Sequence, residues 1–103
     1  MRIYRVLVRG RFADLDDAVR ARLLAEADDH DVLGAAFSET GTLTYDRDLV
    51  AFTCRYQLRL DDDDAGREAA AEALARATGD LAAVGVAHRG LDARAIDMAS
   101  AWR

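Results

Sequence analysis

The stretch LVAFTCRYQLRL, residues 49–60, decides the fold of this 103-residue chain because its side chains alternate in character without interruption. Apolar side chains stand at every second position: Val50, Phe52, Cys54, Tyr56, Leu58 and Leu60. The positions between them hold Ala51, Thr53, Arg55, Gln57 and Arg59. Successive side chains of a strand point to opposite faces. The stretch therefore predicts an antiparallel strand with one face on the core and the other uncovered.

The flanking segments complete an order of strands and helices. Alternation also marks residues 2–9 and 32–46, helical spacing marks residues 14–29 and 65–77, and residues 81–98 are mixed but mostly strand-like. The resulting βαββαβ order predicts an α+β two-layer sandwich. We expect a ferredoxin-like antiparallel sheet with two helices on one face, room for one extra hairpin strand, and a single domain over residues 1–103.

Local signals set the expected element boundaries. Asp14 is the expected N-cap of the first helix, and Gly79 is the expected C-cap of the second. A strand is expected over residues 32–38, followed by a turn and a short strand or continuation up to Asp46. The last strand is expected to start near Ala83 and to break at Gly90.

The composition excludes several classes of protein. The formal net charge is -5, which argues against general nucleic-acid binding, and all fourteen basic residues are arginines. The single cysteine, Cys54, allows no internal disulfide and fits a reducing compartment. The N-terminal apolar stretch is too short and too interrupted by arginine for a signal peptide or a membrane span. We expect a cytoplasmic protein without membrane or nucleic-acid partners.

Most sequence motifs that could indicate catalysis or ligand binding have a simpler structural explanation in this chain. The acidic run that begins at Asp61 has some of the spacing of a calcium loop, but Ala65 occupies a ligand position and the following residues read as a helix. The glycines form neither a phosphate loop nor a dinucleotide fingerprint, so we expect no cofactor and no metal. Cys54 reads as an inert core thiol, and His30 as a surface residue at a helix end. His88 remains a candidate for a role on the open face of the sheet.

The uncovered face of the sheet is expected to be unusually rich in arginine. The first and the long strand should be central neighbours, which would place five polar side chains together on the outward side: Arg5, Arg9, Arg55, Gln57 and Arg59. Ile3 and Leu7 place apolar area among them. This face could be merely solvated, could bind an anionic or planar small molecule, or could be buried in a homodimer.

Three segments carry a resemblance to a known family: HDVLGAAFSETGTLTYD (30–46), VRG (8–10) and IDMASA (96–101). The chain resembles, over nearly its whole length, a family of short actinobacterial proteins with a domain of unknown function. The LTYD stretch is the most specific part, and the resemblance implies that Tyr45, Asp46, Asp97 and Met98 occupy recurring positions. It implies no activity.

Three function classes stay open from the sequence. The first is a small-molecule-binding homodimer that uses the arginine-bearing face, and the second is a protein–protein interaction module. The third is a cofactor-free enzyme of secondary metabolism, of cyclase or monooxygenase type, in which Tyr45, Asp46 and the arginines would converge on one pocket. The candidate ligand-binding residues are therefore Arg5, Arg9, Arg55, Gln57, Arg59, Tyr45, Asp46, His88 and Asp97.

Overall fold

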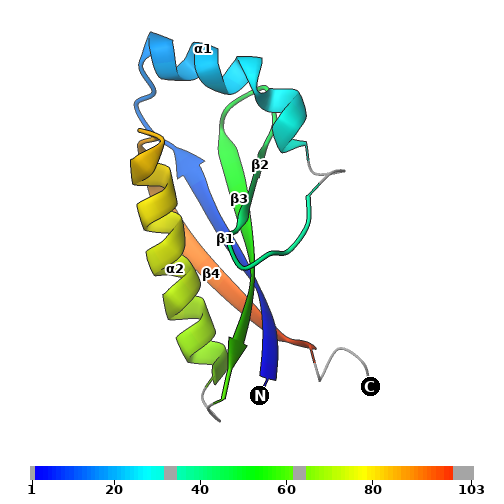
Figure 1. The fold of residues 1–103 in the computed structure, drawn as a ribbon. Coiled ribbons are helices and arrows are strands. Elements are labelled where there is room, and N and C mark those ends of the chain that lie inside the picture. Colours follow the sequence, from blue (N-terminus) through cyan, green and yellow to red (C-terminus); the bar gives the residue numbers. More distant parts are fainter. Residues whose placement is uncertain (1, 32–34, 62–64, 99–103) are drawn as a thin grey trace.

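The computed structural model describes residues 2–31, 35–61 and 65–98 of the chain. Four strands and two α-helices follow one another in the expected βαββαβ order, with a short 3-10 helix after the first α-helix (Figure 1). The elements are β1 (Arg2–Phe12), α1 (Asp17–Ala25), η1 (Ala27–His30), β2 (Thr42–Tyr45), β3 (Ala51–Leu60), α2 (Ala65–Ala83) and β4 (His88–Asp97). The α+β sandwich predicted from the sequence is confirmed and is consistent with a ferredoxin-like fold.

The four strands form one antiparallel sheet in the order β2-β3-β1-β4, so β1 and β3 are the central neighbours that the sequence predicts. Their register pairs Val6 with Tyr56 and Val8 with Cys54, and all four of these side chains are buried. The residues between them on each strand face the other side of the sheet. From Ala51 onward the predicted alternation is thus the alternation between core and outer face, but the placement of Val50 on the core side is wrong, because Val50 is exposed before the strand begins and Leu49 is buried instead.

Helix α2 covers the core face of the sheet with small side chains. Ala69, Ala73 and Ala77 are fully buried against the strands, and Leu81 extends the same stripe by one turn. Alanine at these spacings lets the helix axis approach the sheet closely, since little side chain stands between them. No helix in the part of the chain that the structure describes is long and apolar enough to cross a membrane.

Helix α1 lies across the end of the sheet opposite the N-terminus rather than alongside α2 (Figure 1). Its side chain Leu23 still joins the common core. The helix is capped by Asp16, whose carboxylate accepts a hydrogen bond of 2.8 Å from the amide of Val19, so the expected cap at Asp14 is wrong by two residues. Asp14 instead adopts a positive φ of 46° in the preceding turn, which is incompatible with an N-cap.

The second expected strand is the part of the fold that the sequence misplaces. Residues 32–34 of the proposed strand 32–38 lie outside the described residues, and residues 35–37 are not in a strand. Ser38 makes one isolated parallel bridge with Tyr56. The chain then turns at Gly41, whose φ of +90° and 2.3 Å clearance between a would-be Cβ and the Tyr56 ring leave room only for glycine. Pairing with β3 therefore begins after this turn, at β2.

The C-terminus of α2 is set by Gly85 and not by Gly79. The amide of Gly85 donates to the carbonyl of Ala82, and the amide of Val86 donates to that of Leu81 at 2.9 Å. This pattern, with Gly85 at φ +71° and an apolar contact between Val86 and Leu81, is a Schellman cap. Gly79 lies inside the helix, so its assignment as the C-cap is wrong.

Strand β4 begins at His88, later than expected, and continues through Gly90. Between the pairs Arg9–Asp92 and Arg11–Arg89, two residues of β4 face a single residue of β1. Gly90 has a φ of +67°, the conformation that a bulge of this kind requires of its glycine. The expected break at Gly90 is thus a bulge within the strand.

Substitutions of Gly79 inside α2 and of Gly85 just beyond its end should change stability in opposite directions. Gly79→Ala should stabilise the protein by about 0.5–1 kcal/mol, because alanine is the better residue inside a helix and nothing lies within 4 Å of its Cβ. Gly85→Ala should destabilise it by about 1–2 kcal/mol, because an L-residue with a Cβ is strained at positive φ. Urea unfolding of both variants measures the two free energies. A loss of stability in Gly79→Ala would contradict the assigned helix end.

Candidate functional site

The outer face of the sheet carries arginines from all three long strands. Directly paired residues share a face, so the registers fix which side chains stand together. Arg55 and Arg94 are both paired with Leu7, and Arg5 and Arg9 stand two residues before and after Leu7 on the same face of β1. The half-buried Leu7 side chain is therefore surrounded by four guanidinium groups. We call Leu7 and these four arginines the arginine square.

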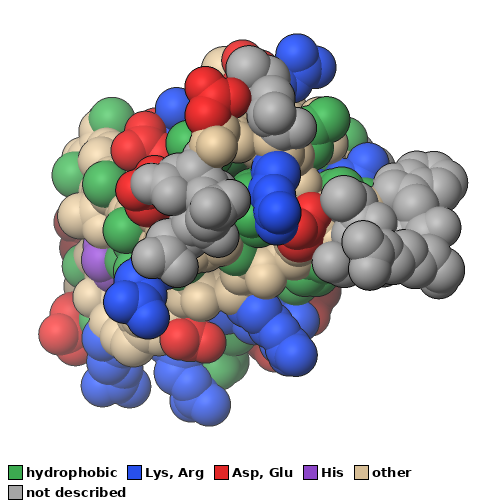
Figure 2. Space-filling model, turned by 90° about the horizontal axis from the view of Figure 1, so that it is seen from below, with side chains coloured by type: hydrophobic (Ala, Val, Ile, Leu, Met, Phe, Trp, Pro, Cys, Tyr) green, Lys and Arg blue, Asp and Glu red, His purple; other side chains and the backbone are tan. Residues whose placement is uncertain are grey.

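Further arginines extend this positive surface. The outward positions of the strands hold seven arginines: Arg5, Arg9, Arg11, Arg55, Arg59, Arg89 and Arg94. Asp92, opposite Arg9, is the acidic residue among the outward positions of these described strands. Figure 2 shows arginine side chains gathered along the lower edge of the view from the end that holds the N-terminus. A protein of net charge -5 thus presents a basic face.

The described contacts of these arginines are hydrogen bonds and a ring contact, not ion pairs. Arg5 donates to the amide oxygen of Gln57 at 3.3 Å and lies 5.1 Å from the ring centroid of Phe37. Arg55 donates to the hydroxyl of Thr44 at 2.6 Å. None of the ion pairs among the described residues includes an arginine of the square. The geometry orients the guanidinium groups but leaves an anion-attracting field above Leu7.

Tyr45 and Asp46 approach the arginine-bearing face only beside Arg55, with which they line a hollow of about 290 Å³. Tyr45 is paired with Phe52 and is buried on the core side, where its hydroxyl donates to the carbonyl of Leu23 at 2.8 Å. Its ring stacks on His30. Burial, together with the nearby Glu26 carboxylate, raises the pKa of Tyr45 above its ordinary value. Asp46 lies exposed in the following turn. The Tyr45 hydroxyl therefore does not face Arg55, although Tyr45, Asp46 and Arg55 line the same hollow.

His88 and Asp97 also belong to the side of the sheet that faces the helices. His88 is paired with Phe12 and its ring meets that of Phe52 edge-on at 6.3 Å. Asp97 is paired with Tyr4 and forms a salt bridge of 3.2 Å with Arg2. Of the nine candidate residues, the structure brings together Arg5, Arg9, Arg55, Gln57 and Arg59 on the outer face.

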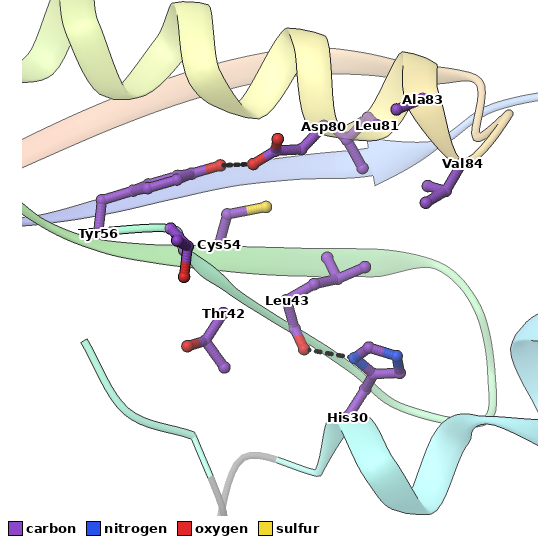
Figure 3. A pocket seen from close by; sticks show the side chains of 11 residues that line it. His30, Thr42, Leu43, Cys54, Tyr56, Asp80, Leu81, Ala83 and Val84 are labelled. Atoms are coloured by element: carbon purple, nitrogen blue, oxygen red, sulfur yellow. Dashed lines mark hydrogen bonds between the residues drawn. The ribbon is translucent and has the colours of Figure 1, made fainter. Parts of the chain in front are cut away.

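A cavity on the core side is the feature that sequence reasoning missed. A space of about 370 Å³ lies between β2, β3 and the C-terminal end of α2 (Figure 3). The hydroxyl of Tyr56 donates to the carboxylate of Asp80 at 2.9 Å on one side of it, and Nδ1 of His30 lies 2.8 Å from the carbonyl oxygen of Leu43 on the other. No local pattern joins these residues, because they come from four separate elements.

Burial governs the ionisable groups on the floor of this cavity. Desolvation and the hydrogen bond to Asp80 raise the pKa of Tyr56 well above its ordinary value, so the phenol stays protonated. Burial, followed by the charge of Asp80, raises the pKa of Cys54 to about 11. Cys54 is 4% exposed, which confirms it as a buried core thiol. Among the described residues, no group of three or more His, Cys, Asp or Glu side chains is placed to hold a metal ion.

The Cys54 thiol should react slowly with a disulfide reagent such as dithionitrobenzoate at pH 8. With a pKa of about 11, only about one thiol in a thousand is then the reactive thiolate. The labelling rate should rise with pH toward that pKa and should become fast in urea, where the thiol regains its ordinary pKa. Stopped-flow absorbance measures the rate. Rapid stoichiometric labelling of the folded protein at pH 8 would contradict this assignment.

Comparison with known proteins places the whole chain in one family. The search of curated proteins and the search of solved structures each return no match. Residues 1–102 match the family of unknown function DUF6204. Since the match covers all the strands and helices described above, the chain belongs to the DUF6204 family.

Proposed function

We propose that this protein binds a small planar anion on the outer face of its sheet, with the arginine square as the binding site. The observation that carries the proposal is the placement of four arginines without carboxylate partners around one apolar side chain. A planar apolar body would cover Leu7. Carboxylate, sulfonate or phosphate groups on its edge would reach the guanidinium groups.

The chemistry of arginine supports this ligand class. A guanidinium group is planar, stays charged at every accessible pH and offers paired N–H donors that match the two oxygens of a carboxylate or phosphate. Its flat face also stacks on aromatic rings, as Arg5 does on Phe37. The half-buried Leu7 and the exposed Ile96 supply the apolar area that a ring system would cover.

The charges of the arginine square should also affect self-association. In a symmetric dimer built on this face, the arginine square of one copy would meet that of its partner, and like charges would repel. An anion held between the two faces would remove this repulsion. We therefore propose a homodimer that forms on ligand binding.

The other two classes receive less support. An acidic protein partner would also complement the basic face, but the square of arginines around a single apolar side chain fits a compact ligand better. A cofactor-free enzyme that uses Tyr45 lacks support, because the Tyr45 hydroxyl is bound to Leu23 on the opposite side of the sheet.

Isothermal titration calorimetry with naphthalene disulfonate tests the binding site. Arg55→Gln and Arg94→Gln should each weaken binding by about threefold to tenfold, the loss expected for a charged hydrogen bond at a partly exposed site. Binding should also weaken as salt screens the charges. Arg20→Gln, which removes an exposed arginine from α1, is the matched control and should leave the affinity unchanged. Equal effects of all three variants, or no saturable binding, would rule out the arginine square.

Sedimentation velocity tests the linked dimer. The protein alone should sediment as a monomer at low salt, and saturating naphthalene disulfonate should shift it to a dimer. The Arg94→Gln variant should need more of the anion to reach the same dimer fraction. A dimer whose amount does not depend on the anion would refute the linkage, while leaving the binding result to stand on the calorimetry.

A further inference from the structure

The cavity between β2, β3 and α2 is a second site with chemistry opposite to that of the arginine square. It exists because α1 lies across the end of the sheet, so the helix-facing side of β2 and part of β3 is not covered by α2 (Figure 1). The floor consists of buried Cys54, Tyr56 and Leu81, and Leu43 and Val84 add apolar walls. A volume of about 370 Å³ falls in the range of small-molecule sites.

A second hollow adjoins the cavity on the side of α1. It measures about 280 Å³ and shares four lining residues with the cavity: His30, Leu43, Ala83 and Val84. Arg22 of α1 borders this second hollow and donates to the carbonyl of Val84 at the end of α2. Asp80 thus lines the first hollow and Arg22 the second.

Asp80 and Tyr56, two of the polar residues that line the first hollow, present hydrogen-bond acceptors. Asp80 is a carboxylate, and the Tyr56 hydroxyl donates its hydrogen bond to it. Both groups can therefore offer only oxygen lone pairs to a ligand. The Leu43 carbonyl can only accept, so Nδ1 of His30 carries a proton and donates to it. The amide of Gly41 is already bound to the hydroxyl of Ser38.

Complementarity then defines the ligand. An apolar molecule that carries hydrogen-bond donors would satisfy both the walls and the polar groups, and a positive charge would be favoured next to Asp80. We propose that this cavity binds a compact aromatic or alicyclic amine, with its ammonium group on Asp80 and its apolar body over Leu81, Leu43 and Val84. In Figure 3 the Asp80 carboxylate lies on the α2 side of the space, and the Val84 side chain points toward it.

Two naphthalene derivatives of the same size separate this proposal from nonspecific apolar binding. Naphthylmethylamine should bind saturably and with at least about tenfold higher affinity than naphthylmethanol, which is neutral and cannot pair with the charge of Asp80. Naphthalene fluorescence or calorimetry measures both affinities. Comparable affinities, or tighter binding of the alcohol, would overturn the proposal.

Asp80→Asn tests the residue that selects the amine. Asparagine keeps the size of the side chain and an oxygen that can accept from Tyr56, but it removes the charge, so naphthylmethylamine should bind about tenfold more weakly. Asp92→Asn, on the outer face, is the matched control and should leave the affinity unchanged. Thermal unfolding of each variant verifies that the fold is intact, and an unchanged affinity in a folded Asp80→Asn variant would overturn the proposal.

Failure here is distinguishable from failure of the arginine square, because the two sites differ in ligand charge and share no residues. Arg55→Gln and Arg94→Gln should not change the affinity for naphthylmethylamine. Loss of amine binding in those two variants would place the amine on the outer face and would overturn the cavity assignment.

Discussion

The register of β1 against β3 is the constraint on which the rest of this structure depends. Because side chains alternate along a strand, a slip of β1 by one residue would exchange its two faces. Val6 and Val8 would then stand in solvent, and Arg5 and Arg9 would face α2. Burying a guanidinium group without a partner costs far more free energy than any surface contact would gain. The arginines of the outer face therefore help to specify the register.

The position of α1 across the end of the sheet follows from its small apolar surface. Its large apolar side chains are few: Leu23 is buried, while Val19 and Leu24 are only partly covered. Such a narrow stripe is satisfied at the end of the sheet, where Tyr45 holds the Leu23 carbonyl through its hydroxyl. The floor that α1 leaves bare is lined by Cys54, Tyr56 and Leu81, so the cavity follows from how little apolar surface this helix has to bury.

Much of the fold could be predicted from the sequence, because period-two alternation over ten residues leaves few alternatives. The faces of β1 and β3 followed from that alternation, and their adjacency followed from the ferredoxin-like order of elements. Together these predicted the cluster of Arg5, Arg9, Arg55, Gln57 and Arg59. Element ends were less predictable where two residues compete for one role. Asp14 and Asp16 both suit an N-cap, and Gly79 and Gly85 both suit a C-cap, so the choice depends on backbone angles that only the folded chain fixes.

The residues of the candidate site also differ in how well the sequence predicts their positions. Tyr45 belongs to a strand of four residues, too short for alternation to show which face it takes, and its partners Leu23 and His30 come from distant segments. The cavity residues Tyr56, Asp80 and His30 are likewise brought together only by packing. The local sequence pattern predicts which side chains a strand presents on each face. A concave site depends instead on how the helices and strands pack against one another.

The bulge at Gly90 has a consequence for the distribution of charge. Without the additional residue, uninterrupted pairing would set Arg89 opposite Phe12 and turn His88 outward. A permanent cation would then press against the aromatic group formed by Phe12 and Phe52, while a weakly basic imidazole took its place among the arginines. A single left-handed glycine thus sorts two neighbouring basic side chains, keeping the one that can be neutral beside the rings and the one that cannot in contact with water.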